Sequence, residues 1–367
     1  MGGSEEAAYF MAHEMAALGY RVTVYNEVRS EEAGEDPRNA NVIWRRHEEY
    51  DADAPPDVFV AWRYHISLGL AVLWPAKPRP KKVFLWLQDA VTGASFTREM
   101  CEEIDGIMVL SEFHKRLLPE VCRSKGRVTP NGIDVAEQFR EGGDGDGDNS
   151  AAALVYGSSP NRGLELVLDV WPEIHERLRK EVGVPATLTI YYGFSESFVA
   201  FGRAGNLGEG FEEWMEGMQA KIATLPGVVY EGMVSHEALV RGYAGAGFML
   251  YPTTYPETGC VTLMKAMCAG AVPITSRFGD STLPELTGRW DEGPERALTG
   301  REGEGERREW EREYVDRVVE SVIRRRKEEE EGGRRSGGGR REEMKRESRT
   351  RFSWKDIARK WHALITE

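Results

Sequence analysis

The chain has 367 residues, of which 41% are hydrophobic and 10% aromatic, so it can bury a sizeable core and is not disordered as a whole. Its length suits two ordinary domains. With 48 Lys and Arg against 61 Asp and Glu, the net charge is −13, which argues against a protein whose main task is to hold a nucleic-acid backbone.

The four cysteines lack the CxxC or His-flanked spacing of a zinc site, and their pattern indicates no disulfide framework. We therefore expect a reducing, cytoplasmic compartment for Cys101, Cys122, Cys260 and Cys268. The sequence has no run of the roughly 18–20 apolar residues that cross a bilayer, so no transmembrane segment is predicted.

The chain starts with a glycine turn at Gly2 and Gly3, followed by an amphipathic helix over 4–18 and a short strand over 21–25. A doubly wound sheet normally has a strand before its first glycine loop, and none precedes these glycines. We therefore expect that a first strand, and with it any targeting leader, is missing upstream.

Short apolar runs over 57–61, 82–87 and 107–110 alternate with helical or loop-like spacers. This spacing predicts a parallel sheet covered on both faces, within a first domain over 1–140. Residues 141–150 (EGGDGDGDNS) predict a flexible linker, because their Gly and Asp content favours no packed element.

A second alternating unit over 151–290 repeats this α/β architecture. Two facing, Rossmann-like doubly wound domains would bind a ligand at the carboxyl ends of their strands. The predicted strands are 154–156, 188–192, 228–230, 248–251 and 271–275, and the predicted helices are 163–179, 236–244 and 260–268.

Residues 291–350 are a charged, low-complexity insertion in which acidic and basic side chains are mixed with Gly. This composition predicts a solvated spacer, helical at best over 310–326, and the interleaved acids argue against nucleic-acid binding. The closing stretch 351–367 places Phe352, Ile357 and Trp361 on one helical face, so we expect a helix that packs back on the folded part.

The most informative stretch is YPTTYPETGCVTLMKAMCAGAVP, residues 251–273. A strand ends at Tyr251, a loop presents Glu257, and a helix starts near Cys260. The free N–H groups and positive dipole at a helix start suit a diphosphate, and Gly259 lets the backbone approach it closely. A carboxylate at this place either binds sugar hydroxyls or caps the helix, and the residues alone leave both possibilities open.

This stretch resembles the nucleotide-sugar loop of retaining, GT-B-fold glycosyltransferases of the family 4 type, whose signature is Glu-x7-Glu followed by Ala-Met-Ala-x-Gly-x-Pro-Val. The resemblance extends over most of the chain outside 141–150 and 291–350. The other matching stretches are GGSEEAA (2–8), MVLSEFHKRLL (108–118), PNGID (130–134), SSPNRGLELVLDVWPEI (158–174) and FSWKDIARKW (352–361).

The resemblance implies two catalytic residues. Glu257 would hold the hydroxyls of the donor sugar, and Arg162 would neutralise the leaving diphosphate, where the family has a lysine before glycine. Backbone groups after Glu257 would receive the distal phosphate, and no metal or other cofactor is implied. The implied substrate-binding residues are Gly2, Gly3, Gln88, Asn131, Ser158, Gly259, Cys260, Val261, Thr262 and Lys265.

Three departures from the family pattern bear on activity. Lys265 stands where a second Glu accepts hydrogen bonds from ribose, which an ammonium cannot do. Gln88 stands where the family often has a histidine that assists the acceptor, and an amide cannot act as a base. The third departure is the absent strand before Gly2.

The leading interpretation is a retaining enzyme that moves a sugar from a nucleotide diphosphate sugar to a hydroxyl group of an unidentified glycan, lipid or small molecule. One alternative, favoured by Lys265 and Gln88, is a catalytically impaired GT-B protein that binds a nucleotide sugar or a protein partner. Another is a GT-B sugar epimerase that uses the same donor cleft with different acid and base residues.

Overall fold

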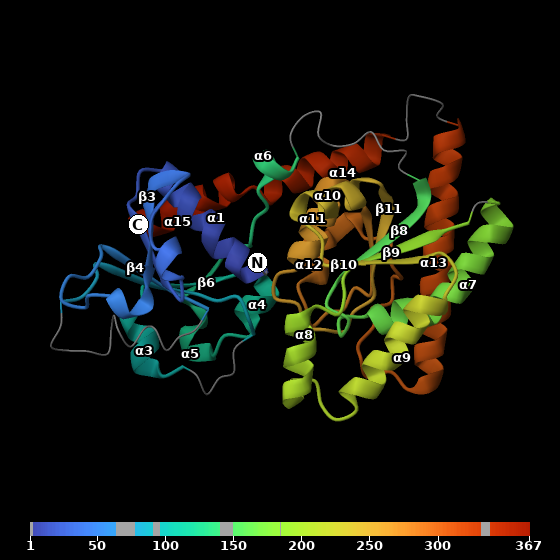
Figure 1. Ribbon diagram of the computed structural model, residues 1–367, viewed down its shortest axis with the longest axis horizontal. Helices are drawn as coiled ribbons and strands as arrows, with labels where there is room; N and C mark the ends of the chain where they lie inside the picture. Colours follow the sequence, from blue (N-terminus) through green and yellow to red (C-terminus); the bar gives the residue numbers. More distant parts are fainter. Residues whose placement is uncertain (1–2, 64–77, 91–95, 140–149, 184, 332–337) are drawn as a thin grey trace. The chain divides into compact units, whose positions relative to one another are not determined.

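The computed structural model describes residues 3–63, 78–90, 96–139, 150–183, 185–331 and 338–367. The chain divides into two compact units, Met1–Asp134 with Thr350–Glu367 (unit 1) and Val135–Arg349 (unit 2). Figure 1 shows helices and strands of both units, with labels where there is room. The expected linker falls, apart from its last residue, outside the described ranges. Of the helices within these ranges, none combines the length and apolar character that crossing a membrane requires.

Unit 1 contains two sheets, where the sequence predicts one. Its strands are β1 (Val22–Asn26), β2 (Gly34–Asp36), β3 (Asn39–Arg46), β4 (Val58–Trp62), β5 (Lys82–Trp86), β6 (Gly106–Val109) and β7 (Gly126–Val128). In the first sheet β3 pairs in parallel with β1 and antiparallel with β2, and in the second β4 to β7 run parallel in that order. The sheets remain separate because no described strand pairs with both β1 and β4.

The helices of unit 1 cover both faces of its second sheet. They are α1 (Gly3–Ala17), α3 (Arg98–Glu103), α4 (Glu112–Arg116), α5 (Glu120–Arg123) and α15 (Trp354–Thr366). On β5, Val83 and Leu85 join an apolar cluster with α3 and α5, whereas Phe84 and Trp86 join a cluster with α1 and α15. Successive strand side chains point to opposite faces, so an unbroken apolar run fits a strand buried between two helical layers.

The last helix, α15, belongs to unit 1 although it follows unit 2 in the sequence. Ile357, Trp361 and Ile365 are buried in the cluster that also contains Met11 of α1. Just before this helix, the carbonyl of Phe352 accepts a hydrogen bond of 2.6 Å from the backbone of Ile133. The closing helix, which the sequence predicts to pack back on the folded part, thus completes the apolar core of unit 1.

Unit 2 is built on one parallel sheet with the strand order β10-β9-β8-β11-β12. These strands are β8 (Ser150–Ser158), β9 (Thr187–Tyr192), β10 (Val228–Gly232), β11 (Ala246–Tyr251) and β12 (Val272–Thr275). Every residue of β11 is buried, as expected for a strand inside a parallel sheet. The helices are α6 (Val135–Gln138), α7 (Leu164–Val182), α8 (Glu196–Phe201), α9 (Phe211–Thr224), α10 (His236–Ala244), α11 (Val261–Ala269), α12 (Leu283–Thr287), α13 (Glu304–Glu331) and α14 (Gly338–Arg351).

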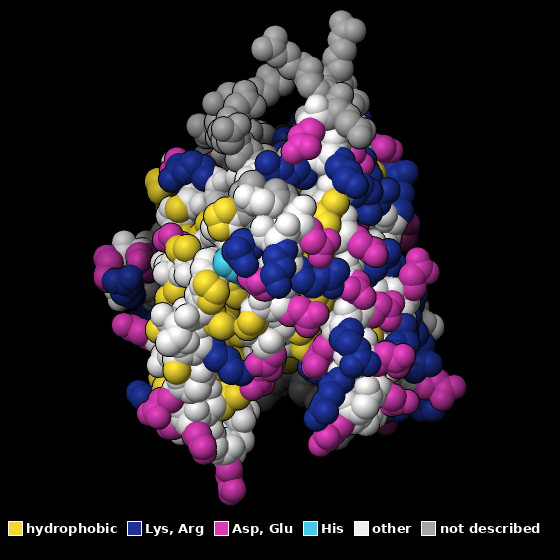
Figure 2. Space-filling view, turned by 90° about the vertical axis from the view of Figure 1, so that its right-hand side faces the viewer, with side chains coloured by type: hydrophobic (Ala, Val, Ile, Leu, Met, Phe, Trp, Pro, Cys, Tyr) yellow, Lys and Arg dark blue, Asp and Glu magenta, His cyan; other side chains and the backbone are white. Residues whose placement is uncertain are grey.

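The described part of the expected spacer over 291–350 is largely helical, so the prediction of a solvated spacer is wrong there. The long helix α13 buries Trp310, Tyr314 and Val318, and the Tyr314 hydroxyl donates a 2.9 Å hydrogen bond to the Ile274 carbonyl of β12. Figure 2, which views the side of Figure 1 where α13 and α7 lie, shows acidic and basic side chains interspersed over this surface. The charged residues are the exposed side of packed helices.

The helix α14 contributes partly buried polar contacts. Arg341 donates from Nε to the carbonyl of Gly270 (2.7 Å) and from Nη2 to that of Ala244 (2.9 Å). Arg349 donates from Nε to the carbonyl of Cys268 at 2.9 Å. These carbonyls lie at the C-terminal ends of α10 and α11, where the last carbonyls of a helix have no intrahelical partner.

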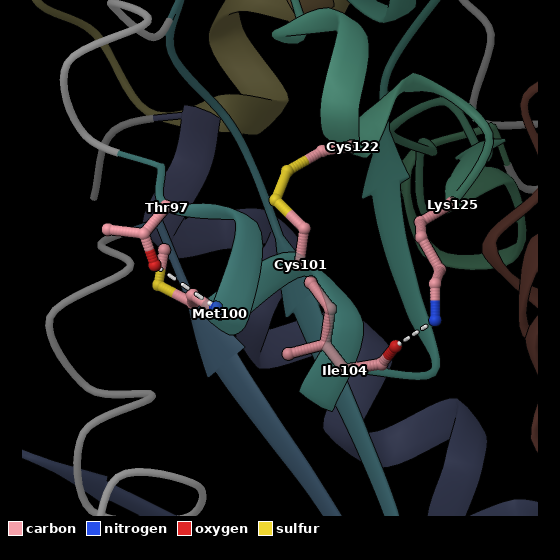
Figure 3. Close-up of a disulfide and its surroundings, with 6 residues drawn as sticks. All are labelled: Thr97, Met100, Cys101, Ile104, Cys122 and Lys125. Atoms are coloured by element: carbon pink, nitrogen blue, oxygen red, sulfur yellow. Dashed lines mark hydrogen bonds between the residues drawn. A yellow bond between two sulfur atoms is a disulfide. The ribbon is translucent and has the colours of Figure 1, made fainter.

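A disulfide joins Cys101 of α3 to Cys122 of α5, with 5.3 Å between the Cα atoms, and Figure 3 shows it beside the N-cap of α3. The expectation that the cysteines form no disulfide is therefore wrong for this pair, while Cys260 and Cys268 are free and buried. Spacing rules did not find the pair because its proximity depends on the packing of two short helices. Close by, Thr97 accepts from the Met100 backbone and Lys125 donates to the Ile104 carbonyl (Figure 3).

Candidate functional site

The predicted residues of unit 2 gather where two neighbouring strands end. β11 and β8 pair in parallel, with Phe248 opposite Leu154 and Met249 opposite Val155. Their last residues, Tyr251 and Ser158, lie within hydrogen-bonding distance of each other. The loops after these strands and the helix α11 carry the other predicted residues of unit 2, and α/β sheets bind ligands at such strand ends.

Arg162 and Glu257 form an ion pair at this edge. One nitrogen of Arg162, Nη1, lies 2.9 Å from Oε1 and 3.0 Å from Oε2 of Glu257. Glu257 is 3% exposed, whereas the Arg162 side chain is 31% exposed and its guanidinium lies over the Tyr255 ring, 4.2 Å from the centroid. The cation is therefore the accessible member of the pair. The sequence predicts both residues, but not their direct contact.

Arg162 stays charged, and one of its N–H donors is available to a ligand. Burial is the largest single effect on the pKa of Arg162, and it lowers that pKa. Glu257 and the other groups around the guanidinium together raise the pKa by more, so it lies above its usual range. Its Nε is buried and makes no hydrogen bond within the described residues. A buried N–H of this kind normally has a partner, which a bound anion could supply.

Tyr251 is a site residue that the sequence analysis missed. Its hydroxyl donates a 2.6 Å hydrogen bond to Oε1 of Glu257, and it is fully buried at the end of β11. Burial raises the pKa of Tyr251 well above its usual value, so the O–H remains a donor. In the sequence this tyrosine only marks the end of a predicted strand.

Gly163 sets the position of Arg162. It has φ of 97° and precedes α7, and a Cβ atom there would lie 2.6 Å from the Pro252 carbonyl oxygen. Only glycine combines this conformation with this approach of the backbone. The turn therefore brings the loop after β8 against the loop after β11.

The start of α11 lies at the same edge. Cys260 is its N-cap residue, and the hydroxyl of Thr262 donates to the carbonyl of Gly157 on β8 and contacts the Tyr243 hydroxyl at 2.9 Å. Burial raises the pKa of the Cys260 thiol, so it remains protonated. Gly259 and Val261 are partly exposed beside it. Free backbone N–H groups at a helix start favour an anion.

Lys265 lies further along α11 and is 5% exposed. Its Nζ is 3.2 Å from Nδ1 of His236, the first residue of α10. The sequence predicts substrate binding by Lys265, and the structure gives it a partner on another helix.

The other predicted residues belong to unit 1. The side-chain amides of Gln88 and Asn131 are buried and bond to each other in both directions, at 3.3 Å and 2.9 Å. Gln88 follows β5, and Asn131 follows β7. Gly3 is the exposed first residue of α1, and Gly2 lies outside the described residues.

Backbone strain also gathers at strand ends. Three described residues other than glycine have positive φ: Arg63 after β4 (66°), Tyr192 at the end of β9 (70°) and Arg277 after β12 (48°). Such conformations cost energy and concentrate at functional sites. No sequence pattern predicts these three conformations.

A scan against protein-family models finds no match, and a search of curated proteins finds none either. Solved structures do match. A glycosyltransferase from Rickettsia africae aligns over 99% of this chain and 94% of its own, with a TM-score of 0.64 at 11% identity. Sucrose-phosphate synthase from Thermosynechococcus elongatus aligns over 100% of this chain and 93% of its own, with a TM-score of 0.63 at 14% identity.

A third structure, HepE of Anabaena in complex with UDP, aligns over 78% of this chain and 72% of its own, with a TM-score of 0.50 at 10% identity. The glycosyltransferase from Rickettsia africae and sucrose-phosphate synthase, which align over the full chain, show the fold. It is the α/β GT-B architecture, with two units that each contain a parallel sheet and a C-terminal helix that returns to the first unit.

Proposed function

We propose that the chain is a glycosyltransferase that moves a sugar, with retention of configuration, from a nucleotide diphosphate sugar to a hydroxyl acceptor. The observation that carries the proposal is the contact of Arg162 with Glu257 beside the start of α11. It unites an accessible cation, the N-terminal end of a helix and a buried carboxylate. Proteins that share the fold support it, since they include a glycosyltransferase and a UDP-bound protein.

In this proposal the diphosphate of the donor binds Arg162 and the backbone N–H groups at the start of α11. Arg162 then turns from Glu257 to the phosphate, and the freed carboxylate oxygens accept hydrogen bonds from the sugar hydroxyls. The bond from the anomeric carbon to the phosphate oxygen breaks, and the acceptor oxygen bonds to that carbon from the same side. The acceptor proton passes to the departing diphosphate, whose growing charge Arg162 stabilises.

The competing proposals use the same site differently. Gln88 bonds to Asn131, and Lys265 contacts His236. Because neither residue is the His or Glu of the family pattern, both fit a protein that binds a nucleotide sugar without transferring it. A sugar epimerase would convert the donor without an acceptor. The absence of a metal requirement and the cytoplasmic location stay predictions from the sequence.

A panel of UDP-, GDP- and ADP-sugars tests the proposal by measuring the released nucleoside diphosphate. We expect release from at least one donor, and a decrease on the order of 100-fold in Glu257→Gln, because an orienting carboxylate is lost. Glu292→Gln is the matched control, since Glu292 is a largely buried carboxylate of unit 2 that pairs with Arg324 instead. Binding without release supports the binding protein, and an altered sugar without release supports the epimerase.

A further inference from the structure

We propose that Tyr251 is the positioning residue that keeps the Glu257 carboxylate in place when Arg162 turns to the diphosphate. The inference rests on the proposed function and adds a residue to it. Two described side chains bond to Glu257: Arg162 through both carboxylate oxygens, and Tyr251 through Oε1.

The two partners differ in how firmly they are held. Arg162 is on a loop and is about one-third exposed, so its guanidinium can reorient. Tyr251 ends β11, is fully buried, and stacks on Tyr156 with ring centroids 6.0 Å apart. When Arg162 leaves, the tyrosine hydroxyl is the firmly held donor that remains on Glu257. A carboxylate that is 3% exposed needs such a donor, because an unpaired buried charge is unstable.

The direction of the hydrogen bonds follows from the chemistry of the groups. An ionised carboxylate only accepts, so the single proton of the Tyr251 hydroxyl points to Glu257. Ser158, whose Oγ lies 3.3 Å from the Tyr251 hydroxyl, must then donate to it. Ser158, Tyr251 and Glu257 thus form a chain in which each hydroxyl has one orientation. The Tyr251 hydroxyl thereby holds Oε1 in place. Oε2, which Tyr251 does not bind, accepts a hydrogen bond from the sugar once Arg162 has moved.

The backbone of Glu257 is anchored separately. Its carbonyl accepts a 2.8 Å hydrogen bond from the Thr282 backbone, and its N–H donates to the Tyr255 carbonyl at 2.8 Å. Loss of the Tyr251 hydroxyl therefore releases the carboxylate without unfolding the loop. We expect a change in the reaction step with little change in the affinity for the nucleotide.

The first experiment compares Tyr251→Phe with Tyr156→Phe on the donor that the wild type uses. Tyr156 is also fully buried, but its hydroxyl donates to the Ser159 carbonyl and not to Glu257. We expect kcat to decrease about 10- to 100-fold in Tyr251→Phe, with the Kd of the free nucleoside diphosphate unchanged within twofold. Tyr156→Phe should keep kcat within about twofold. Equal kcat values in the two variants, or equal losses, would overturn the proposal.

The second experiment does not depend on turnover and separates this inference from the proposed function. Crystal structures of Arg162→Met and of Arg162→Met with Tyr251→Phe compare the carboxylate with and without its tyrosine. We expect Glu257 to keep its position in the first variant and to rotate toward solvent in the second. An unmoved carboxylate in both, or a moved one in both, contradicts a positioning role for Tyr251, whatever the donor panel gives.

Discussion

The indole of Trp361 on α15 meets that of Trp86 on β5 edge to face, with 4.7 Å between the ring centroids and 73° between the planes. Both side chains are almost fully buried, at 2% and 4% exposure. This contact ties the last helix of the chain to a strand near its beginning. Edge-to-face pairs of this kind add stability beyond the area that they bury.

Trp361→Ala should therefore lower the free energy of unfolding of unit 1 by about 3–5 kcal/mol, the usual cost of removing a buried aromatic side chain. Urea unfolding followed by circular dichroism measures it. Lys360→Ala, an exposed neighbour on the same helix, is the control and should change stability by less than about 0.5 kcal/mol. Equal tolerance of both changes would show that α15 contributes nothing to the core.

Gly163→Ala should destabilise unit 2 by more than Gly183→Ala, although both glycines flank α7 with positive φ (97° and 71°). The left-handed conformation alone costs alanine about 1–2 kcal/mol. At Gly163 the new Cβ also meets the Pro252 carbonyl, whereas at Gly183 nothing lies within 4 Å. Chemical denaturation of the two variants measures the difference, and similar losses would mean that the Pro252 contact relaxes without cost.

His114 should make unit 1 less stable in mild acid. It is buried between the Leu110 N–H, which donates to Nδ1, and the Asp89 carbonyl, which accepts from Nε2, so the neutral ring fits. Burial lowers the pKa of His114 to about 4. Because this lies below the unfolded value of about 6.5, stability is present above pH 6.5 and decreases as the pH falls toward 4, by about 2 kcal/mol at pH 5.

Urea unfolding at pH 7 and pH 5 tests this for the wild type and His114→Gln. The variant should be less stable at pH 7, but its loss between the two pH values should be smaller than that of the wild type. The same loss in both proteins would assign the acid sensitivity to other groups.

Arg341→Met should destabilise unit 2 by about 2–4 kcal/mol, because it leaves buried carbonyls at the ends of α10 and α11 without their charged donor. Arg340→Met is the control, since the Arg340 side chain is 62% exposed. Thermal unfolding measures both. A negligible effect at Arg341 would restore the view that this charged stretch is a spacer.

The sequence predicts best where a local pattern decides the structure. The strand over 248–251 and the helix over 260–268 correspond to β11 and α11, because an apolar run, a glycine and a second apolar run carry the whole signal. The same stretch holds Glu257, which the structure places at the predicted edge. That Arg162 contacts it could not be read from spacing, because 95 residues separate them.

The prediction of a solvated spacer over α13 and α14 was wrong because it relied on composition. Their many charged residues suggest solvation, but the buried residues of α13 recur at helical intervals, from Trp310 through Tyr314 and Val318 to Val322. Periodicity within this charged stretch was the available signal. For Tyr251 and the cysteine pair no local signal exists, because each role arises from a tertiary neighbour.

The placement of α15 also affects the order in which the two units can fold during synthesis on the ribosome. Phe84 and Trp86 of β5 are made early, yet the helix that covers them is encoded after the whole of unit 2. Until residues beyond 350 have left the exit tunnel, nascent unit 1 lacks this part of the cover of its apolar face, whereas the strands of unit 2 can already pair. Chaperones that recognise exposed apolar surface should therefore bind the first part of the nascent chain, and they should release it only when the last helix docks.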